Sequence, residues 1–333
     1  MPAIISMFNN KGGVGKTTYL YHIAHLLADR GTRVLMVDCD SQCNLTAYSM
    51  NETQIKKSWA PEGNSIFRNI EPVFKTTGDI NHRKPSKVIH TNKELYIVPG
   101  DLSLSDFEDR LGDTWNGAKG GNEADLRAQA AIFRVIKSAA DKVEADVVLV
   151  DLGPNLGALN RAVLAGSDYF LTPVAPDLFS IQGTANLGNK LVRWRQEWDQ
   201  CNASWSGALS IPQGRPSYLG YVIQQHNQRS TNAGGMTQGW MIYRDQLEPA
   251  ILENIVDKLA AYSQVVSWDN DDYNLGQIPN LHSLIPYSLN AQKPIFHCNS
   301  TDGLNGAHIA TARDSGEYFH DVVEMMEFVI EQH

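Results

Sequence analysis

Residues 9–18 read Asn-Asn-Lys-Gly-Gly-Val-Gly-Lys-Thr-Thr, and this stretch decides how the chain around it folds. An unbroken apolar run, residues 3–8, precedes it, and residues 20–27 after it carry apolar side chains at helical spacing. Gly31 stands where a glycine often ends a helix, and the apolar run 34–37 suits a strand that is buried on both faces. The order strand, glycine-rich loop, helix, strand predicts a βαβ unit.

The rest of the chain continues this alternation of apolar strands and amphipathic helices. Strands are expected near residues 94–98, within 145–154, and at 169–174 and 218–225; helices are expected near 126–142, 184–198, 249–262 and 317–331. Such alternation indicates an α/β fold, here a three-layer, mostly parallel twisted sheet with helices on both faces. We expect a single domain over residues 1–333, with polar insertions near residues 51–93 and 200–247.

The 333 residues carry a formal net charge of −9, and beyond Gln200 there are 6 Lys and Arg against 14 Asp and Glu. This distribution does not favour a protein that binds nucleic acid through a basic surface patch. No apolar run reaches the roughly 20 residues that span a bilayer, so we expect no membrane segment. The first residues lack a signal-peptide pattern, and four scattered cysteines do not form a disulfide framework. The expected location is the cytoplasm.

The glycine-rich loop has the composition of a phosphate-binding loop. Its glycines let the backbone turn N–H groups toward phosphate oxygens, and the following helix adds the positive end of its dipole. Lys16 is expected to contact the β and γ phosphates, and the Thr17 hydroxyl to complete the coordination of Mg²⁺. Asn10 replaces the first glycine of an ordinary P-loop, and a glycine-rich turn without a ligand is the alternative. The candidate nucleotide-binding residues are Lys11, Gly12, Gly13, Val14, Gly15, Lys16, Thr17 and Thr18.

The lysine directly before the glycine pair, Lys11, makes this loop distinctive. The string Lys-Gly-Gly-Val-Gly-Lys-Thr-Thr resembles the deviant Walker A box of the ParA/MinD family of P-loop ATPases, closest to the ParA partition proteins, and the resemblance extends through most of the chain. It implies an ATPase that uses ATP and Mg²⁺, forms a homodimer around ATP, and hydrolyses ATP slowly until a partner protein stimulates it. It also implies that Lys11 reaches the other subunit's nucleotide as an arginine finger does, which makes Lys11 and Lys16 candidate catalytic residues. A solvated Lys11 is the alternative.

Two further motifs are similar to boxes of the same family. Residues 37–46, Val-Asp-Cys-Asp-Ser-Gln-Cys-Asn-Leu-Thr, carry Asp40 where the family has an aspartate that orients water or holds Mg²⁺ through water, although serine replaces the usual proline. Asp40 is therefore a candidate catalytic and metal residue, and a turn-forming aspartate is its alternative; Asp38 is expected to be structural. Asp151, at the end of an apolar strand, resembles the Walker B aspartate. Carboxyl ends of parallel strands converge on one sheet edge, so Thr17, Asp40 and Asp151 are expected to meet at one metal site.

The residues that contact the adenine base are less defined by the sequence. Position suggests the strand end Gln224–Gln225 and the later loop with Pro279 and Asn280, which resembles the family's segment after its late strand; a plain turn is the alternative. Cys39 and Cys43 have no second Cys or His pair at zinc-like spacing and are expected to pack in the core. The acidic last helix is expected to pack inward and not to bind a membrane.

Three functions remain open on the sequence. The first is an ATP-dependent dimerisation switch used in plasmid or chromosome partition or in cargo positioning, with non-specific DNA as the track. The second is a nucleotide-gated protein-interaction module, which positions a complex or serves a defence operon without contacting DNA. The third, an ATP-dependent amidoligase, lacks an identifiable substrate pocket. The basic residues available late in the chain for DNA are Arg215, Arg229, Arg244, Lys258, Lys293 and Arg313.

Overall fold

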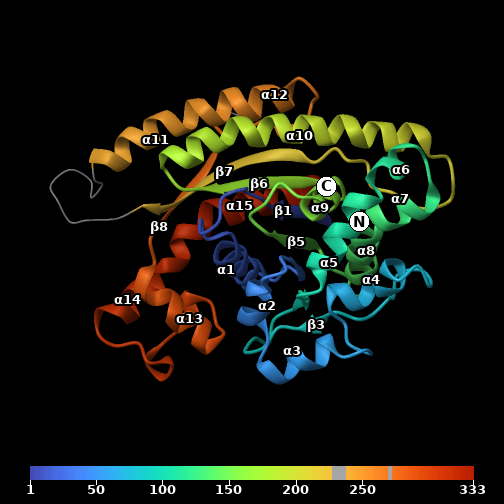
Figure 1. Cartoon of the computed structure of the whole chain (residues 1–333). Coiled ribbons are helices and arrows are strands. Elements are labelled where there is room, and N and C mark those ends of the chain that lie inside the picture. The colour runs from blue at the N-terminus through green and yellow to red at the C-terminus, as the bar shows by residue number, and fades with distance from the viewer. Residues whose placement is uncertain (227–237, 269–271) are drawn as a thin grey trace.

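The computed structural model describes residues 1–226, 238–268 and 272–333, and its centre is one sheet of eight strands (Figure 1). The strand order is β3-β4-β2-β5-β1-β6-β7-β8, and every neighbouring pair is parallel except β3 and β4. This confirms the predicted mostly parallel α/β sheet. The strands are β1 (Ala3–Met7), β2 (Val34–Cys39), β3 (Ser86–Lys87), β4 (Leu95–Val98), β5 (Val147–Leu152), β6 (Tyr169–Val174), β7 (Ser217–His226) and β8 (Asn274–Pro279).

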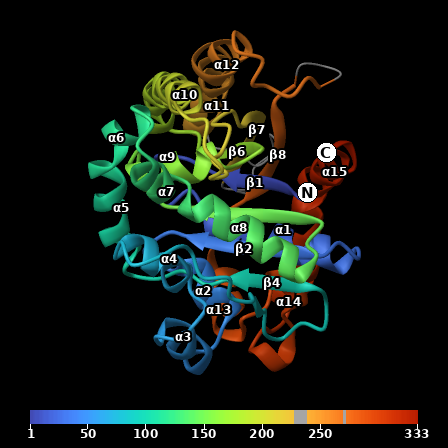
Figure 2. The same cartoon turned by 90° about the vertical axis from the view of Figure 1, so that its right-hand side faces the viewer.

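Helices cover both faces of the sheet and complete the three layers (Figure 2). One face carries α1 (Lys16–Asp29) and α15 (His320–Gln332), and the other carries α4 (Ile66–Phe74), α8 (Ala131–Val143) and α10 (Leu178–Ser204). The remaining helices are α2 (Asn44–Ser49), α3 (Glu52–Trp59), α5 (Leu104–Asp113), α6 (Trp115–Lys119), α7 (Glu123–Gln129), α9 (Ala158–Ala165), α11 (Gln238–Ile251), α12 (Asp257–Ala260), α13 (Ile285–Ala291) and α14 (Ala307–Asp314).

The central strand β5 shows how the sequence produces two cores. Its side chains alternate between the faces of the sheet, so that Val148 and Val150 join the core on one face while Val147 and Leu149 join the other. All are fully buried. This burial on both faces explains the near-continuous apolar sequence of the strand. Asp151 interrupts the apolar run close to its carboxyl end.

The helix boundaries differ from the predicted ones where local geometry changes. The helix expected near 126–142 is divided at Ala130 into α7 and α8, and the one expected near 184–198 is longer and runs through all of α10. A π-helical turn, Leu252–Val256, separates α11 from α12 within the helix expected near 249–262. These interruptions carry no glycine or proline signal at the break itself, so propensity alone does not reveal them.

The two predicted insertions contain structural elements of the core. Within 51–93, α4 buries Ile66 and Ile70 against the sheet, because its apolar residues share one face of the helix. Within 200–247, β7 lies between β6 and β8, and residues 227–237 of that range lie outside the described residues. The division of the chain into domains therefore stays a prediction.

The final helix packs as its apolar stripe predicts. Val322, Val323 and Met326 are fully buried in the core that α1 also covers. Within the part of the chain that the structure describes, no helix combines the length and the apolar character needed to cross a bilayer. All four cysteines are free and buried, in agreement with the packing role expected for Cys39 and Cys43.

Two glycines of α10 provide a matched test of how closely this helix packs. A Cβ on Gly188 would collide with the backbone carbonyl of Asn254 in the π-helical turn, whereas a Cβ on Gly183 would have its nearest neighbour 3.6 Å away, at Asn10 Oδ1. We expect Gly188→Ala to lower the free energy of unfolding by about 2 kcal/mol or more through overpacking. Gly183→Ala is expected to be neutral or to stabilise by up to about 1 kcal/mol through helix propensity. Urea unfolding midpoints measure both, and equal effects would contradict the close approach.

Candidate functional site

The glycine-rich loop joins β1 to α1 and leaves the first turn of the helix open. Gly13 and Gly15 have φ angles of 74° and 78°, in the left-handed region that glycine adopts without strain. Gly15 occupies the N-cap position of α1, and none of the described side chains caps the helix there. The N–H groups of the first turn and the positive end of the helix dipole therefore form an anion-binding site at Lys16 and Thr17.

A cavity of about 430 Å³ lies over this helix end and brings the three sequence motifs together. It is lined by Gly12 to Thr18 of the loop, by Asp40 and Gln42 of the second motif, and by Pro154 of the third. The register of the sheet explains the convergence: Asp151 pairs with Met7 of β1 on one side and with Asp38 of β2 on the other. Each loop thus begins at the same sheet edge.

Asp151 is fully buried directly beneath the loop. The Thr17 hydroxyl donates to Asp151 Oδ2 at 2.7 Å, while Oδ1 has no hydrogen-bond partner among the described residues. Burial and the neighbouring Asp38 raise the pKa of Asp151 to about 8, against the hydrogen bond from Thr17. A buried carboxylate oxygen without a partner beside a hydroxyl fits a Mg²⁺ site completed by substrate phosphates and water. Thr17 and Asp151 are therefore together, as predicted, and Asp40 lines the adjoining cavity.

Lys16 begins α1, and its ammonium lies within the loop. Nζ donates to the carbonyl oxygen of Lys11 at 3.1 Å, and the residue is only 7% exposed. Burial lowers the pKa of Lys16, although the carboxylates of Asp151 and Asp40 oppose this shift. An anion in the loop would supply a stronger acceptor than the carbonyl.

Asp40 stands in the turn after β2, on a loop that Asp38 holds in place. Asp38 accepts hydrogen bonds from the Thr46 N–H and hydroxyl, at 2.9 and 2.6 Å, and from the Asp40 N–H at 3.2 Å. Burial raises the pKa of Asp38 to about 6, despite these three donors. Asp40 Oδ1 in turn accepts from the Gln42 N–H at 3.0 Å. Asp38 thus has the structural position that the sequence predicts.

A second cavity, of about 270 Å³, adjoins the first, since Gly13, Gly15 and Thr18 line both. The predicted base-contacting residues Pro279 and Asn280 lie in its wall, together with Gln224. Gln224 is 5% exposed, its Nε2 has no partner among the described residues, and its Oε1 lies directly over Gly15. The rest of the wall is apolar, with Tyr19, Ile278, Leu281, Ile285 and Phe319. The Gln225 side chain lies outside the described residues.

A protein-family model described as an AAA domain matches residues 2–202, which is more than half of the chain. The chain belongs to this family. Its curated relatives include ParA-type proteins: it is 28% identical to the sporulation initiation inhibitor protein Soj of Bacillus subtilis over 189 residues, 57% of this chain and 64% of Soj. It is 25% identical to the chromosome partitioning protein ParA of Caulobacter vibrioides over 193 residues, 58% of this chain and 63% of ParA.

A putative replication protein A of Rhizobium rhizogenes is 33% identical over 184 residues, 54% of this chain and 41% of that protein. The chain therefore spans about half of the length of the first curated relatives. A crystal structure of a protein from Corynebacterium diphtheriae is similar with a TM-score of 0.67 and 27% identity, over 87% of this chain and 97% of that one. The ATP complex of McdA from Cyanothece has a TM-score of 0.62 at 15% identity, over 98% and 96% of the two chains, and shares the fold. The ParA-type P-loop fold is thus confirmed.

Asp177 is a residue of this ParA-type site that the sequence analysis missed. Lys11 Nζ pairs with Asp177 Oδ2, and the other carboxylate oxygen caps α10 by accepting from the Ser180 N–H at 3.0 Å. Burial opposes ionisation, but the hydrogen bonds from Lys11 and the Ser180 N–H and the charge of Lys11 together lower the pKa of Asp177. Lys11 is therefore not simply solvated. An aspartate before a helix is a recognisable cap signal, but nothing in the sequence links it to Lys11, 166 residues away.

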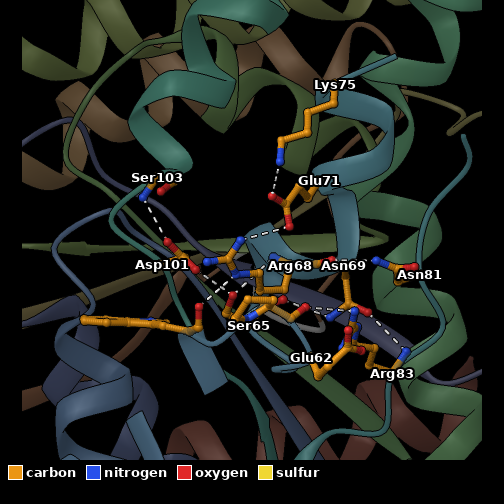
Figure 3. A network of polar contacts seen from close by, with 12 residues as sticks. Glu62, Ser65, Arg68, Asn69, Glu71, Lys75, Asn81, Arg83, Asp101 and Ser103 are labelled. Atoms are coloured by element: carbon orange, nitrogen blue, oxygen red, sulfur yellow. Dashed lines mark hydrogen bonds and ion pairs between the residues drawn. The ribbon is translucent and has the colours of Figure 1, made fainter. Parts of the chain in front are cut away.

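A polar network ties α4, in the predicted insertion, to the loop after β4 (Figure 3). The Ser65 hydroxyl donates to Asp101 Oδ2 at 2.6 Å, and Asp101 Oδ1 accepts from the Ser103 N–H at 3.0 Å. The neighbouring Gly100 N–H donates to the Thr46 hydroxyl oxygen at 2.7 Å. Because Thr46 also bonds Asp38, continuous buried contacts join the insertion to the loop that carries Asp40.

Proposed function

We propose that this chain is an ATP-binding and ATP-hydrolysing dimerisation switch of the ParA type, used in DNA partition or cargo positioning. The observation that carries the proposal is the junction of two cavities at the first turn of α1. The larger one combines the open helix end with Lys16, Thr17 and Asp40, as a triphosphate requires. The smaller one is mostly apolar, as a base requires.

The proposed roles follow from the position of each side chain. Lys16 and the loop N–H groups bind the β and γ phosphates, while Thr17 and Asp151 hold Mg²⁺, with Asp40 acting through water. Bound Mg²⁺ would neutralise charge on the phosphate oxygens. Asp40 lines the phosphate cavity and is 8% exposed, which suits a carboxylate that orients the attacking water. Pro279 and Asn280 contact the base.

Lys11 is proposed to act across a homodimer. Its side chain is 30% exposed and lies at the start of the loop, where only Asp177 and Ser180 face its ammonium among the described residues. To reach another subunit's nucleotide it must leave Asp177, so dimerisation has to replace one ion pair with contacts to phosphate. A partner protein that stimulates hydrolysis would act on this assembled state.

Two hypotheses for the cargo have different support: the names of the relatives favour DNA, and the acidic charge of the later part of the chain favours a protein complex. Relatives named for chromosome partitioning and replication support a DNA track. The 14 acidic against 6 basic residues beyond Gln200 favour the alternative, a nucleotide-gated protein-interaction module without DNA. An electrophoretic shift assay with ATP separates them: we expect binding that weakens steeply with salt if DNA is the track. Absence of any shift with ATP at low salt would select the interaction module.

Three variants test the switch itself. Lys16→Ala is expected to remove ATP binding, because the phosphates lose the ammonium that lies within the loop. Asp40→Ala is expected to bind ATP, hydrolyse it slowly and accumulate as a dimer. Lys11→Ala is expected to bind ATP and remain a monomer. Calorimetry measures binding, phosphate release measures hydrolysis, and light scattering with ATP and Mg²⁺ measures the assembly.

Each variant has an outcome that contradicts its assigned role. Micromolar ATP affinity in Lys16→Ala would refute the phosphate-binding loop, and normal turnover in Asp40→Ala would refute the role of that carboxylate. An intact ATP-dependent dimer of Lys11→Ala would remove Lys11 from the interface. The surface variant Lys57→Ala, whose lysine lies on α3 in the predicted insertion, serves as the matched control for loss of one positive charge.

Gln224 is proposed to select adenine. Its amide presents a donor and an acceptor, which match N7 and the N6 amino group of adenine but not the O6 and N7 acceptors of guanine. We expect wild type to bind ATP more tightly than GTP, and we expect the ratio of the two affinities to fall about tenfold in Gln224→Leu. 7-Deaza-ATP, which lacks the N7 acceptor, should bind wild type less tightly than ATP but bind Gln224→Leu equally. An unchanged ATP-to-GTP ratio in the variant would contradict this role.

A further inference from the structure

Residues 281–304, here called the cap, follow β8 and form one wall of both cavities. Leu281 and Ile285 line the smaller cavity, and Leu289 lines the larger one. The cap contains α13, which lies beside α2 and below α1 (Figure 1). It lies wholly outside residues 2–202, the part that matches the family model. The cap therefore contributes to the shape of both cavities, although it contains none of the phosphate-binding motifs.

Three polar contacts fasten the cap to the helices that carry those motifs, and one of them, between His297 Nε2 and Asp29 Oδ2 at 2.8 Å, lies at the end of α1 far from the loop. Gln292 Nε2 donates to the carbonyl oxygens of Ala47 and Met50 at the end of α2. On α1, His22 Nε2 accepts a hydrogen bond from the Ile295 N–H at 3.0 Å. The contact of His22 joins the cap to α1, the helix whose first turn forms the anion site.

His22 is bonded at both ring nitrogens. Nδ1 lies 2.6 Å from the carbonyl oxygen of Thr18, and Nε2 lies 3.0 Å from the backbone nitrogen of Ile295. Because a carbonyl only accepts and an N–H only donates, both bonds form together only when the ring is neutral with its proton on Nδ1. His22 thus connects Thr18, which lines both cavities, to the cap through one imidazole.

Two aromatic side chains enclose the His22 ring in the core. It is fully buried and stacks on Phe319, with centroids 5.2 Å apart and planes inclined by 10°, while Phe296 of the cap meets it edge-on at 5.8 Å. Burial lowers the pKa of His22 to about 4, although the bond to the Thr18 carbonyl opposes this shift, so the ring is neutral near pH 7. Phe319 also lines the smaller cavity.

We propose that His22 is a positioning residue for the nucleotide, because its bond to Ile295 holds the cap against α1 and so fixes the wall on which base and ribose rest. This inference rests on the proposed function, since it takes ATP as the ligand of the two cavities. It predicts that loss of the bond weakens contacts to the base and ribose while contacts to the phosphates remain. The phosphates bind to the N–H groups of the loop and to Lys16, whereas the cap reaches their cavity through Leu289, an apolar side chain that offers them no hydrogen bond.

Calorimetry with two ligands, ATP and inorganic tripolyphosphate, each with Mg²⁺, tests the proposal. In His22→Asn the shorter amide still reaches the Thr18 carbonyl but not Ile295, whereas in His22→Gln the amide oxygen reaches the position of Nε2. We expect ATP affinity to fall about tenfold in His22→Asn, the size of one lost buried hydrogen bond, and to stay within about threefold of wild type in His22→Gln. Tripolyphosphate affinity is expected to stay within about twofold in both.

His25 provides the matched control. It is also a buried histidine of α1, 2% exposed, but neither of its ring nitrogens has a hydrogen-bond partner among the described residues. His25→Leu therefore removes a buried imidazole and its edge-on contact with the His297 ring of the cap, at 6.2 Å between centroids, without cutting a hydrogen bond to the cap. Its ATP affinity is expected to stay within about threefold of wild type. Hydrogen exchange of the peptide around Ile295 adds a direct readout: faster exchange in His22→Asn, and wild-type exchange in His22→Gln.

The results that would overturn the proposal are distinct from failure of the proposed function. Wild-type ATP affinity in His22→Asn, or an equal loss in His22→Gln, would show that the bond to Ile295 does not position the nucleotide. An equal loss for ATP and tripolyphosphate would indicate general damage to the loop. If wild type bound neither ligand, the nucleotide role of both cavities would fail, and this inference with it.

Discussion

The pairing of β5 between β1 and β2 is the constraint on which the rest of the site depends. Its register sets Asp151 beside Met7 and Asp38, so the loops that follow β1, β2 and β5 leave the sheet at one edge. The Thr17 hydroxyl then bonds Asp151 directly, which fixes the first turn of α1 over the buried carboxylate. A shift of β5 by one residue would send Asp151 to the opposite face of the sheet and leave a carboxylate in the apolar core.

This convergence has an electrostatic cost in the ligand-free protein. Burial and the neighbouring Asp38 raise the pKa of Asp151 to about 8, burial raises the pKa of Asp38 to about 6, and burial lowers the pKa of Lys16. Each shift favours the neutral form of its group, and at pH 7 it is Asp151, with a pKa of about 8, whose carboxyl is mostly protonated. A triphosphate with its divalent cation would supply a counter-charge for each group. Such perturbed groups are typical of functional sites, whereas a purely structural cluster would gain stability from apolar replacements.

The parts of the fold and site that could be predicted are those encoded locally. Gly13 and Gly15 indicate the tight turn of the loop at residues 9–18. The positions of the aspartates at strand ends are predictable because each apolar run stops at or near one of them. The contacts that the sequence did not reveal join distant segments: Lys11 with Asp177 is 166 residues apart, and His22 with Ile295 is 273 residues apart. The sequence around Lys11 or His22 does not indicate which distant residue its side chain contacts. The structural role of residues 51–93 could not be predicted for another reason. The apolar face of α4 is short and is surrounded in the sequence by polar residues, and it becomes recognisable only where it packs against the sheet.

The residues of the candidate site come from two parts of the sequence, one within the match to the family model and one beyond it. The residues proposed to bind phosphate and metal all lie within residues 2–202, whereas Gln224, Pro279, Leu281 and Phe319, which line the smaller cavity, lie beyond them. The later part is joined to the earlier one by the β6–β7 ladder and by a shared apolar core, and its cap is joined by polar contacts that include those of His22 and Gln292. Substitutions beyond residue 202 are therefore able to alter base selectivity and the fit of the cap while leaving the phosphate-binding loop intact. A sequence match confined to the first part predicts the reaction chemistry, but base recognition has to be argued from the contacts of the second.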